Sequence, residues 1–368
     1  MPSSDAAWMA RALALAARGL GRTFPNPAVG AIFVRAGRVV GEGFHARAGA
    51  AHAEVEALRR AGARARGATL YVTLEPCAHQ GRTPPCVDAL LPLGLARVVV
   101  ATGDPDPRVR GRGIRALRRA GIPVDVGVGR ADADLLLAGY RSRILRGRPQ
   151  VTLKLALTLD GRIAAQSGDA RWITGPAARR MGHALRDVSD AILVGAGTVR
   201  ADDPRLTCRL PGGHDPIRVV VAGAGLDLPT RAQLLAPGGP PTWIVAPRTA
   251  PAARVERLRR RGIEMILLPA RRGRIAFDAI ARSLGDRGIT SLLVEGGGTV
   301  AAAALRDRCV DRAVLFLAPM LLGGDALPAV GALGIARIAD AIRLDGLSVA
   351  RVGDDLVLEG RVRYRSES

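Results

Sequence analysis

Three zinc-binding side chains, each beside a distinctive neighbour, constrain this chain more than any other part of its sequence. His52 precedes Ala53-Glu54, and two cysteines follow as Pro76-Cys77 and Pro85-Cys86, with eight residues between them. One imidazole and two thiolates leave a fourth tetrahedral position for water, which is typical of catalytic zinc, because structural sites usually have four protein ligands. Zinc lowers the pKa of such a water to about 7. Glu54 is predicted to be no ligand but the catalytic group that moves protons between this water and the substrate.

Each of these residues alone has a simpler explanation. His52 could be a surface histidine, and the two cysteines could be small core residues. Three suitable residue types, each with the expected neighbour, make a chance pattern improbable, so we predict a metal site formed by His52, Cys77 and Cys86. Cys86 is expected at the start of a helix, where the helix dipole favours a thiolate.

The chain is too long for one ordinary hydrophobic core. Its 368 residues are 48% hydrophobic and 24% charged, which suits two globular domains and excludes a disordered chain. Helix-like and strand-like runs alternate up to residue 145, which is typical of an α/β fold with a mostly parallel sheet, and the pattern begins afresh at 151. The best linker is Arg146-Gly147-Arg148-Pro149, so we expect domains at 1–147 and 148–368.

Hydrophobic periodicity predicts most helices and strands. Helices are expected at 6–18, 53–63, 86–93, 113–120, 131–145, 176–186, 252–261, 275–284 and 299–307. Strands are expected at 29–34, 38–42, 68–74, 98–101, 124–128, 151–157, 191–194, 217–221, 242–245, 265–268, 291–294, 314–317 and 355–360.

Two glycine-rich segments of the second half are candidates for binding phosphate. Gly195-Ala196-Gly197-Thr198-Val199-Arg200 lacks the last glycine of the dinucleotide-binding fingerprint, so it indicates a Rossmann site only weakly. Glu295-Gly296-Gly297-Gly298-Thr299 is a better cradle, because it follows an apolar strand and opens a helix whose free N–H groups can bind an anion. A mere turn after the strand is the simpler alternative.

The net charge of +21 invites a nucleic-acid partner, but its makeup argues against one. Lys154 is the only lysine among 54 basic residues, and the arginines are spread along the whole chain. Aromatic residues, which stack on RNA bases, are only 3%. Four cysteines form no disulfide framework in a chain of this size, and no segment has eighteen uninterrupted apolar residues. We therefore expect a cytoplasmic protein with no nucleic-acid and no membrane partner.

The first half resembles known zinc deaminases. His-x-Glu with Pro-Cys is similar to cytidine-deaminase-like enzymes, in which the glutamate passes a proton to the pyrimidine ring and the leaving ammonia. Those enzymes usually have Cys-x-x-Cys, and the longer loop from Cys77 to Cys86 resembles the bifunctional riboflavin-biosynthesis deaminase/reductase family instead. The same resemblance is carried by Pro25-Asn26-Pro27-x-Val29-Gly30, Gly49-x-x-His52, Thr73-Leu74-Glu75-Pro76 and Asp104-Pro105-Asp106-Pro107, although Asn is usual at Asp106.

The second half carries further motifs of that family in the family order. It is similar to dihydrofolate-reductase-like enzymes that bind NADPH, and the whole match covers roughly residues 8 to 360. The motifs are Lys154-Leu155-Ala156, Asp160-Gly161-Arg162, Trp172-Ile173-Thr174, His183-x-Leu185-Arg186, Asp202-Asp203-Pro204-x-Leu206-Thr207, Glu295-Gly296-Gly297 and Ala318-Pro319-x-Leu321-Leu322-Gly323-Gly324.

The resemblance implies a cytidine-deaminase-like three-layer domain followed by a dihydrofolate-reductase-like α/β domain. Asn26 and His79 would contact the substrate in the deaminase pocket, unless Asn26 only shapes its turn and His79 is a solvated loop residue. The residues implied to touch NADPH are Ala156, Trp172, Thr198, Asp202, Gly297, Gly298, Thr299, Val300, Ala301, Ala302 and Ala303. Those expected to touch the reductase substrate are Lys154, Ala170, Arg186, Leu206, Arg209 and Glu295.

Lys154 enters that set because strand residues alternate faces, which places it on the same side as Ala156. Chance is the alternative, since one lysine must lie somewhere. This half departs from the family pattern at three places. Thr158 stands where Ser is preferred, Ala170 stands where a substrate-binding Ser is common, and Ala222-Gly223 replaces Asp-Ser after a strand.

The implied reactions are deamination of 2,5-diamino-6-(5-phosphoribosylamino)pyrimidin-4-one at a zinc site, then NADPH reduction of the ribosyl group of the uracil product to ribityl. Arginines would hold the phosphate, and we expect a homo-oligomer. The alternative is a tRNA-editing deaminase whose residues 150–368 bind RNA. A third possibility is that one of the two domains is inactive.

Overall fold

The computed structural model describes residues 4–81 and 84–365. The chain divides into two compact units, Met1–Gly147 and Arg148–Ser368. Within the described ranges, no helix is long and apolar enough to cross a membrane.

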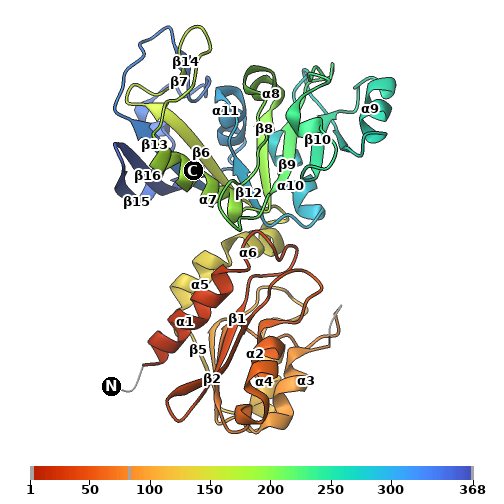
Figure 1. The fold of residues 1–368 in the computed structure, drawn as a ribbon, viewed down its shortest axis with the longest axis vertical. Helices are drawn as coiled ribbons and strands as arrows, with labels where there is room; N and C mark the ends of the chain where they lie inside the picture. Colours follow the sequence, from red (N-terminus) through yellow and green to blue (C-terminus); the bar gives the residue numbers. More distant parts are fainter. Residues whose placement is uncertain (1–3, 82–83, 366–368) are drawn as a thin grey trace. The chain divides into compact units, whose positions relative to one another are not determined.

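The first unit is built on one five-stranded sheet (Figure 1). Strand β1 is antiparallel to both of its neighbours, β2 and β3, whereas β3, β4 and β5 run parallel to one another. In sheet order the strands are β2 (Arg38–Phe44), β1 (Gly30–Arg35), β3 (Thr69–Leu74), β4 (Arg97–Thr102) and β5 (Val124–Val126).

Helices cover both faces of this sheet, so the unit has three layers. One face packs its buried side chains against α2 (Ala53–Ala61), α3 (Cys86–Leu90) and α4 (Arg112–Arg119). The other face packs against α1 (Asp5–Ala17) and α5 (Arg130–Leu136). The single helix expected over 131–145 is wrong: Leu137 leaves helical geometry at φ −89° and ψ 6°, and α6 (Ala138–Arg146) follows as a separate helix.

The second unit contains a nine-stranded sheet with a parallel centre (Figure 1). The strands from β11 to β13 are parallel, and β16 and β15 add an antiparallel edge. In sheet order they are β11 (Glu264–Leu268), β10 (Thr242–Pro247), β9 (Ile217–Val221), β8 (Ala191–Gly195), β12 (Ser291–Val294), β6 (Gln150–Thr158), β13 (Arg312–Ala318), β16 (Asp355–Arg363) and β15 (Arg343–Val352). A separate pair joins β7 (Arg162–Ala164) to β14 (Leu327–Pro328).

The central strands are buried on both faces, as parallel strands usually are. Neighbouring residues such as Ile192 and Leu193 in β8 are both fully buried. With both faces covered, a ligand reaches this sheet at the ends of its strands, and in open α/β sheets the carboxyl ends are the usual place. The helices of this unit are α7 (Pro176–Asp187), α8 (Ala196–Asp202), α9 (Ala252–Arg259), α10 (Phe277–Asp286) and α11 (Gly298–Arg306).

Candidate active sites

The three predicted zinc ligands converge in the first unit. His52 caps the start of α2, Cys77 lies in the loop after β3, and Cys86 begins α3. His52 Nδ1 lies 3.1 Å from Cys86 Sγ and 3.6 Å from Cys77 Sγ. Ligand atoms bonded to one tetrahedral zinc ion at ~2.0–2.3 Å are themselves roughly 3.5 Å apart. The cluster therefore has the composition and the spacing that fit zinc.

Close backbone packing holds this cluster in place. A Cβ on Gly43 would lie 2.5 Å from the backbone nitrogen of Ala57, so the glycine lets β2 press against α2, the helix that carries His52. A Cβ on Gly113 would lie only 1.9 Å from the carbonyl oxygen of Pro76, directly before Cys77. Glu75 adds hydrogen bonds between the loop after β3 and the start of α4. Its buried carboxylate accepts from the backbone N–H groups of Gly111 at 2.9 Å and Ile114 at 3.2 Å.

The start of α3 at Cys86 stabilises a thiolate at the other cysteine, Cys77. The backbone N–H of Cys86 donates to Cys77 Sγ at 3.3 Å. Hydrogen bonds from Cys86 and from His52 lower the pKa of Cys77 to about 4, although burial opposes the shift. Cys86 begins α3, as expected, and its hydrogen bond to Cys77 together with burial raises the pKa of its thiol.

Glu54 lies in the first turn of α2 and is 4% exposed. Burial raises the pKa of its carboxyl group. The metal-binding group consists of His52, Cys77 and Cys86 alone among the residues that the structure describes. Glu54 borders the same pocket as His52 and Cys77 without belonging to the metal-binding group, which is the position expected of a group that transfers protons.

This pocket has a volume of about 330 Å³ and contains both residues predicted to contact the deaminase substrate. Asn26 and His79 line it, together with Glu54 and the zinc ligands His52 and Cys77. The Nδ1 atom of His79 is buried and has no hydrogen-bond partner within the described part of the chain. A ligand in the pocket could satisfy this nitrogen.

His45 is a pocket residue that the sequence did not reveal. Its Nδ1 lies 3.0 Å from the carbonyl oxygen of Ala51, which can only accept, so Nδ1 carries the proton. Its Nε2 then accepts from the amide of Asn26, 3.1 Å away. Burial lowers the pKa of His45, which keeps the ring neutral. As a result Asn26 turns its NH₂ group toward His45 and keeps its Oδ1 as the acceptor for a ligand.

A second group of pocket residues follows β4. Burial raises the pKa of Asp104 to about 6, and Tyr140 donates its hydroxyl to this carboxylate at 3.0 Å. Asp106 instead pairs with Arg108, whose Nη2 lies 2.6 Å from Asp106 Oδ2, and this hydrogen bond lowers the pKa of Asp106. The arginine thus neutralises the charge that an Asp brings to a position where Asn is usual.

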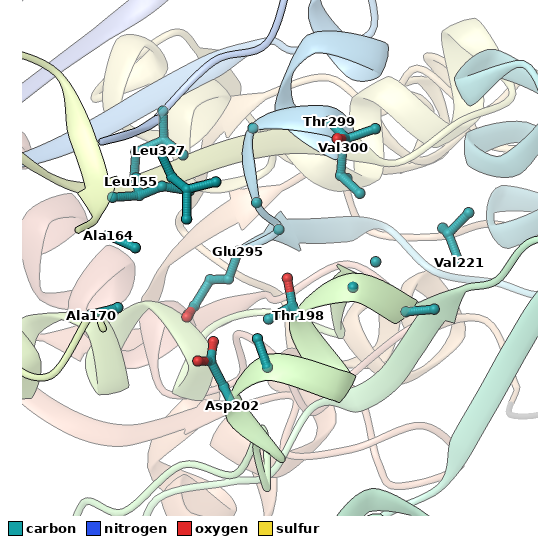
Figure 2. Close-up of a pocket in the computed structure, with 18 of the residues that line it drawn as sticks. Leu155, Ala164, Ala170, Thr198, Asp202, Val221, Glu295, Thr299, Val300 and Leu327 are labelled. Carbon is teal, nitrogen blue, oxygen red and sulfur yellow. The ribbon is translucent and has the colours of Figure 1, made fainter. Parts of the chain in front are cut away.

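The second unit has a larger cleft, of about 980 Å³, at the carboxyl ends of its parallel strands. Figure 2 shows Glu295 reaching into it from the end of β12, with Thr198 and Asp202 on α8 nearby and Thr299 and Val300 on α11. The glycine segments after β8 and β12 both border this cleft. The cradle predicted at 295–299 therefore opens onto this cleft.

Three charged side chains meet at one end of this cleft. Arg186 on α7 donates to both carboxylate oxygens of Glu295, at 3.0 and 2.8 Å, and Lys154 Nζ lies 3.7 Å from Glu295 Oε2. Burial opposes ionisation of Glu295, but Lys154 and Arg186 lower its pKa to about 2. Two cations with one carboxylate leave a net positive charge, which suits an anionic substrate.

Most of the predicted reductase residues line the cleft, and three do not. Ala301 and Ala302 are 0% and 2% exposed on the buried side of α11, because only one side of a helix can face a cavity. Leu206 has a positive φ of 56°, and its side chain is 3% exposed in the hydrophobic core. The lining set includes Lys154, Ala156, Ala170, Trp172, Arg186, Thr198, Asp202, Arg209, Glu295, Gly297, Gly298, Thr299, Val300 and Ala303.

The structure adds His183 to this end of the cleft. Its Nε2 lies 3.0 Å from Nε of Arg209, so the histidine accepts from the guanidinium and orients it. Burial, Arg186 and Arg209 lower the pKa of His183, which keeps the ring able to accept. The motif that contains His183 was visible in the sequence, but nothing there assigned it a partner.

Family models match both units. The model described as RibD C-terminal domain matches residues 149–358, and the model described as cytidine and deoxycytidylate deaminase zinc-binding region matches residues 2–102. The chain belongs to the RibD family.

Relatives named riboflavin biosynthesis protein RibD match along the whole chain. The protein of Aquifex aeolicus is 41% identical over 96% of this chain and 97% of its own length. The protein of Escherichia coli K12 is 42% identical over 96% of this chain and 98% of its own length.

Solved structures of RibD agree with the fold. Form 1 of Acinetobacter baumannii RibD has a TM-score of 0.87 at 38% identity and covers 98% of this chain and 99% of its own. A Thermotoga maritima diaminohydroxyphosphoribosylaminopyrimidine deaminase/5-amino-6-(5-phosphoribosylamino)uracil reductase has a TM-score of 0.85 at 34% identity and the same two coverages.

Membership in the RibD family confirms the predicted family, fold class and function. The chain is a bifunctional deaminase and reductase of riboflavin biosynthesis, with a zinc-binding deaminase region that holds His52, Cys77 and Cys86. Its second unit is a RibD reductase domain, so the alternative of an RNA-binding appendage on an editing deaminase is wrong.

Proposed function

We propose that the first unit deaminates 2,5-diamino-6-(5-phosphoribosylamino)pyrimidin-4-one and that the second reduces the ribosyl group of the uracil product to ribityl with NADPH. The observation that carries this proposal is the presence of two complete sites in one chain. A zinc-ligand cluster beside buried Glu54 lies in one unit, and a glycine-lined cleft with a cationic end lies in the other. The Thermotoga maritima relative, named for these two activities, supports the choice of substrates.

The deaminase residues have distinct tasks in this proposal. His52, Cys77 and Cys86 bind zinc, which when bound supplies a Lewis acid that makes water acidic enough to react at neutral pH. Glu54 would take a proton from the reacting water on a carboxylate oxygen and deliver it to the ring nitrogen. A second proton, from the hydroxyl group added to the ring, would then pass through the same carboxylate to the amino group, which leaves as ammonia. Asn26 offers its Oδ1 to an N–H group of the pyrimidine, since His45 fixes the orientation of the amide.

The residues at 295–299 and on α8 fit a dinucleotide. A Cβ on Gly297 would lie 3.7 Å from Thr198 Oγ1, so a side chain there would fill the gap between α11 and α8. Gly298 begins α11, whose free N–H groups can bind a pyrophosphate. Ala156 and Trp172 would contact the same cofactor, and NADPH when bound supplies the hydride.

The cationic end of the cleft fits the phosphorylated substrate of the reduction. Arg209, oriented by His183, binds the phosphate, because a guanidinium fork matches phosphate oxygens. Lys154, Arg186 and Glu295 bind the sugar and hold it against the cofactor, so that reduction depends mainly on positioning.

A coupled assay tests the proposed function. The purified chain, loaded with zinc, is expected to release ammonia from the diaminopyrimidine nucleotide and then oxidise NADPH in step with formation of the ribityl product. The deaminated nucleotide alone should support NADPH oxidation without ammonia release. Ammonia release with no NADPH oxidation on either nucleotide would contradict the reductase half, and the converse would contradict the deaminase half.

Lys154→Arg is expected to lower the reductase kcat at least tenfold, or about 1.4 kcal/mol. Arg186 already occupies both oxygens of Glu295, and Lys154 Nζ and Cε lie 3.8 Å from the ideal Cβ position of Gly182 on α7. A guanidinium at position 154 therefore finds no carboxylate with both oxygens free. It also lacks the room to replace the compact ammonium. Steady-state kinetics with the deaminated nucleotide measure the effect. Deaminase activity should not change. Wild-type reductase kinetics in this variant would show that the position of the only lysine is due to chance.

Ala170→Ser is expected to lower the reductase KM for the nucleotide. Ala170 lines the cleft, so a serine hydroxyl there can donate one hydrogen bond to the substrate, worth about 0.5–1.5 kcal/mol. Initial-rate measurements at varied nucleotide concentration give the KM. Ser167→Ala, three residues earlier and outside the cleft lining, is the matched control. An unchanged KM in Ala170→Ser would show that the substrate lies beyond reach of this position.

We further propose that the enzyme works as a homo-oligomer in the cytoplasm. Strand β15 is the edge of its sheet and exposes Leu347 and Val349, which are 50% and 60% exposed. Such an edge invites pairing with a second copy. All four cysteines are free thiols, which suits a reducing compartment. Light scattering of the purified chain measures the oligomeric state, and a monomer at micromolar concentration would contradict the proposal.

A further inference from the structure

The deaminase pocket contains a cluster of charged and polar residues besides its zinc ligands. Asp104, Asp106 and Arg108 line the pocket from the segment after β4, and Tyr140 lines it from α6. These residues are joined to one another, because Asp104 accepts both the hydroxyl of Tyr140 and the backbone N–H of Asp106, the latter at 2.8 Å. The proton transfers proposed for this pocket use none of these side chains.

Asp106 holds the guanidinium of Arg108 in one orientation. Arg108 Nε lies 3.0 Å from Asp106 Oδ1 and 3.1 Å from Oδ2, and its Nη2 lies 2.6 Å from Oδ2. The backbone N–H of Arg108 donates to Oδ1 of the same carboxylate at 2.9 Å. The side chain of Asp106 is 6% exposed, so the arginine is fixed to a buried anchor at both of its ends.

This pairing leaves one edge of the guanidinium available. An arginine side chain carries five N–H donors in a planar fork, and Asp106 engages the edge formed by Nε and Nη2. Within residues 4–81 and 84–365, Nη1 of Arg108 has no hydrogen-bond partner. The edge formed by Nη1 and Nη2 can therefore donate two parallel hydrogen bonds to two oxygens of one phosphate group. Arg108 lines the pocket, so a bound ligand can reach this edge.

Burial also distinguishes Arg108 from the groups that react. Glu54 is 4% exposed, whereas the side chain of Arg108 is 72% exposed. The pyrimidine ring must reach the buried group, and its phosphate, separated from the ring by the ribose, retains water best at an exposed position. Arg143 on α6 lines the pocket as well, so two arginines balance the two acids of the cluster, and a phosphate is not repelled.

We propose that Arg108 binds the phosphate of the deaminase substrate and makes the first unit selective for the nucleotide over the corresponding nucleoside. This inference rests on the proposed deamination of a phosphoribosylaminopyrimidine. It gives the ion pair with Asp106 a purpose, because the carboxylate turns the second edge of the guanidinium into a preformed phosphate fork.

Ammonia release from the nucleotide and from the nucleoside, which lacks the phosphate, tests the proposal. The assay uses the zinc-loaded full-length chain without NADPH, so that only deamination is measured. A charge-assisted contact with a phosphate changes affinity roughly 10- to 100-fold. Wild type should therefore have a kcat/KM at least tenfold higher for the nucleotide. Arg108→Ala should raise the KM for the nucleotide at least tenfold, with little change in kcat and none in the kcat/KM for the nucleoside.

Ribose 5-phosphate provides a second measurement on the same variants. It should inhibit ammonia release from the nucleotide competitively in wild type, and its inhibition constant should rise at least tenfold in Arg108→Ala. Arg110→Ala is the matched control, because Arg110 is an exposed arginine two residues later that does not line the pocket. This variant should keep the wild-type preference for the nucleotide and the wild-type inhibition constant.

The outcomes separate this proposal from the proposed function. Equal kcat/KM of wild type for nucleotide and nucleoside would overturn the phosphate contact and leave deamination standing. An equal fall of both activities in Arg108→Ala would also overturn it, because the arginine would then serve only to neutralise Asp106 or to hold its loop. Failure of zinc-loaded wild type to release ammonia from either compound would overturn the proposed deaminase function itself.

Discussion

Glu54→Gln is expected to lower the deaminase kcat by roughly 10²–10⁴-fold, the usual contribution of a positioned acid and base. Glutamine keeps the shape of the buried side chain but cannot take up a proton from water or return it to the ring. The three zinc ligands are untouched, so the variant should still contain one zinc per chain. Elemental analysis and ammonia release measure the two properties on the same sample.

Two comparisons make this experiment decisive. Glu56→Gln alters a partly exposed residue on the same helix, α2, whose carboxylate pairs with Arg60 at 2.8 Å, and it should keep full deaminase activity. Reductase activity of Glu54→Gln on the deaminated nucleotide should equal that of wild type. Loss of zinc from Glu54→Gln would show that Glu54 is a ligand, and the proton-transfer role would then be wrong.

Cys86→Ser is expected to abolish zinc binding and with it all measurable deaminase activity. Serine offers a hydroxyl that stays protonated at neutral pH, whereas zinc binds cysteine as a thiolate. Two protein ligands would remain, too few for a stable catalytic site. Every ligand lies in the first unit, so reduction of the deaminated nucleotide should continue at the wild-type rate.

Cys309→Ser is the matched control for this variant. Cys309 is a buried cysteine of the second unit, so its replacement should change neither zinc content nor deamination. Circular dichroism on Cys86→Ser establishes that the chain still folds. A folded Cys86→Ser protein that has lost both activities would contradict two independently working sites.

The fold was predictable wherever burial imposes a pattern on the sequence. Strands such as β6 and β8 and helices such as α2 and α7 have buried faces, and their positions follow from hydrophobic periodicity. Strand β15 was missed because most of its residues are exposed, so no apolar alternation marks it. The short helix α8 was missed because its glycine-containing start was compared with a phosphate-binding loop.

The candidate sites divide in a similar way. His52, Cys77 and Cys86 were predictable because zinc restricts residue types and each ligand has a characteristic neighbour. His45 and His183 were not, since a lone histidine gives no sign of the carbonyl or the arginine that it meets in the fold. Ala301 and Ala302 entered the predicted cofactor set because a continuous stretch was chosen, although only one side of α11 borders the cleft.

The order of strands in the second sheet has a consequence for synthesis on the ribosome. Strand β6 comes first in its unit, but both of its neighbours, β12 and β13, come from residues 291–318. Gln150 therefore has no strand to pair with until Ser291 has emerged, whereas every strand of the first sheet is present once residue 126 has been made. Distant pairings of this kind delay folding. A nascent chain can thus complete its deaminase sheet long before its reductase sheet. A ribosome that stalls near residue 290 leaves β6 with unpaired edges that can aggregate with other chains.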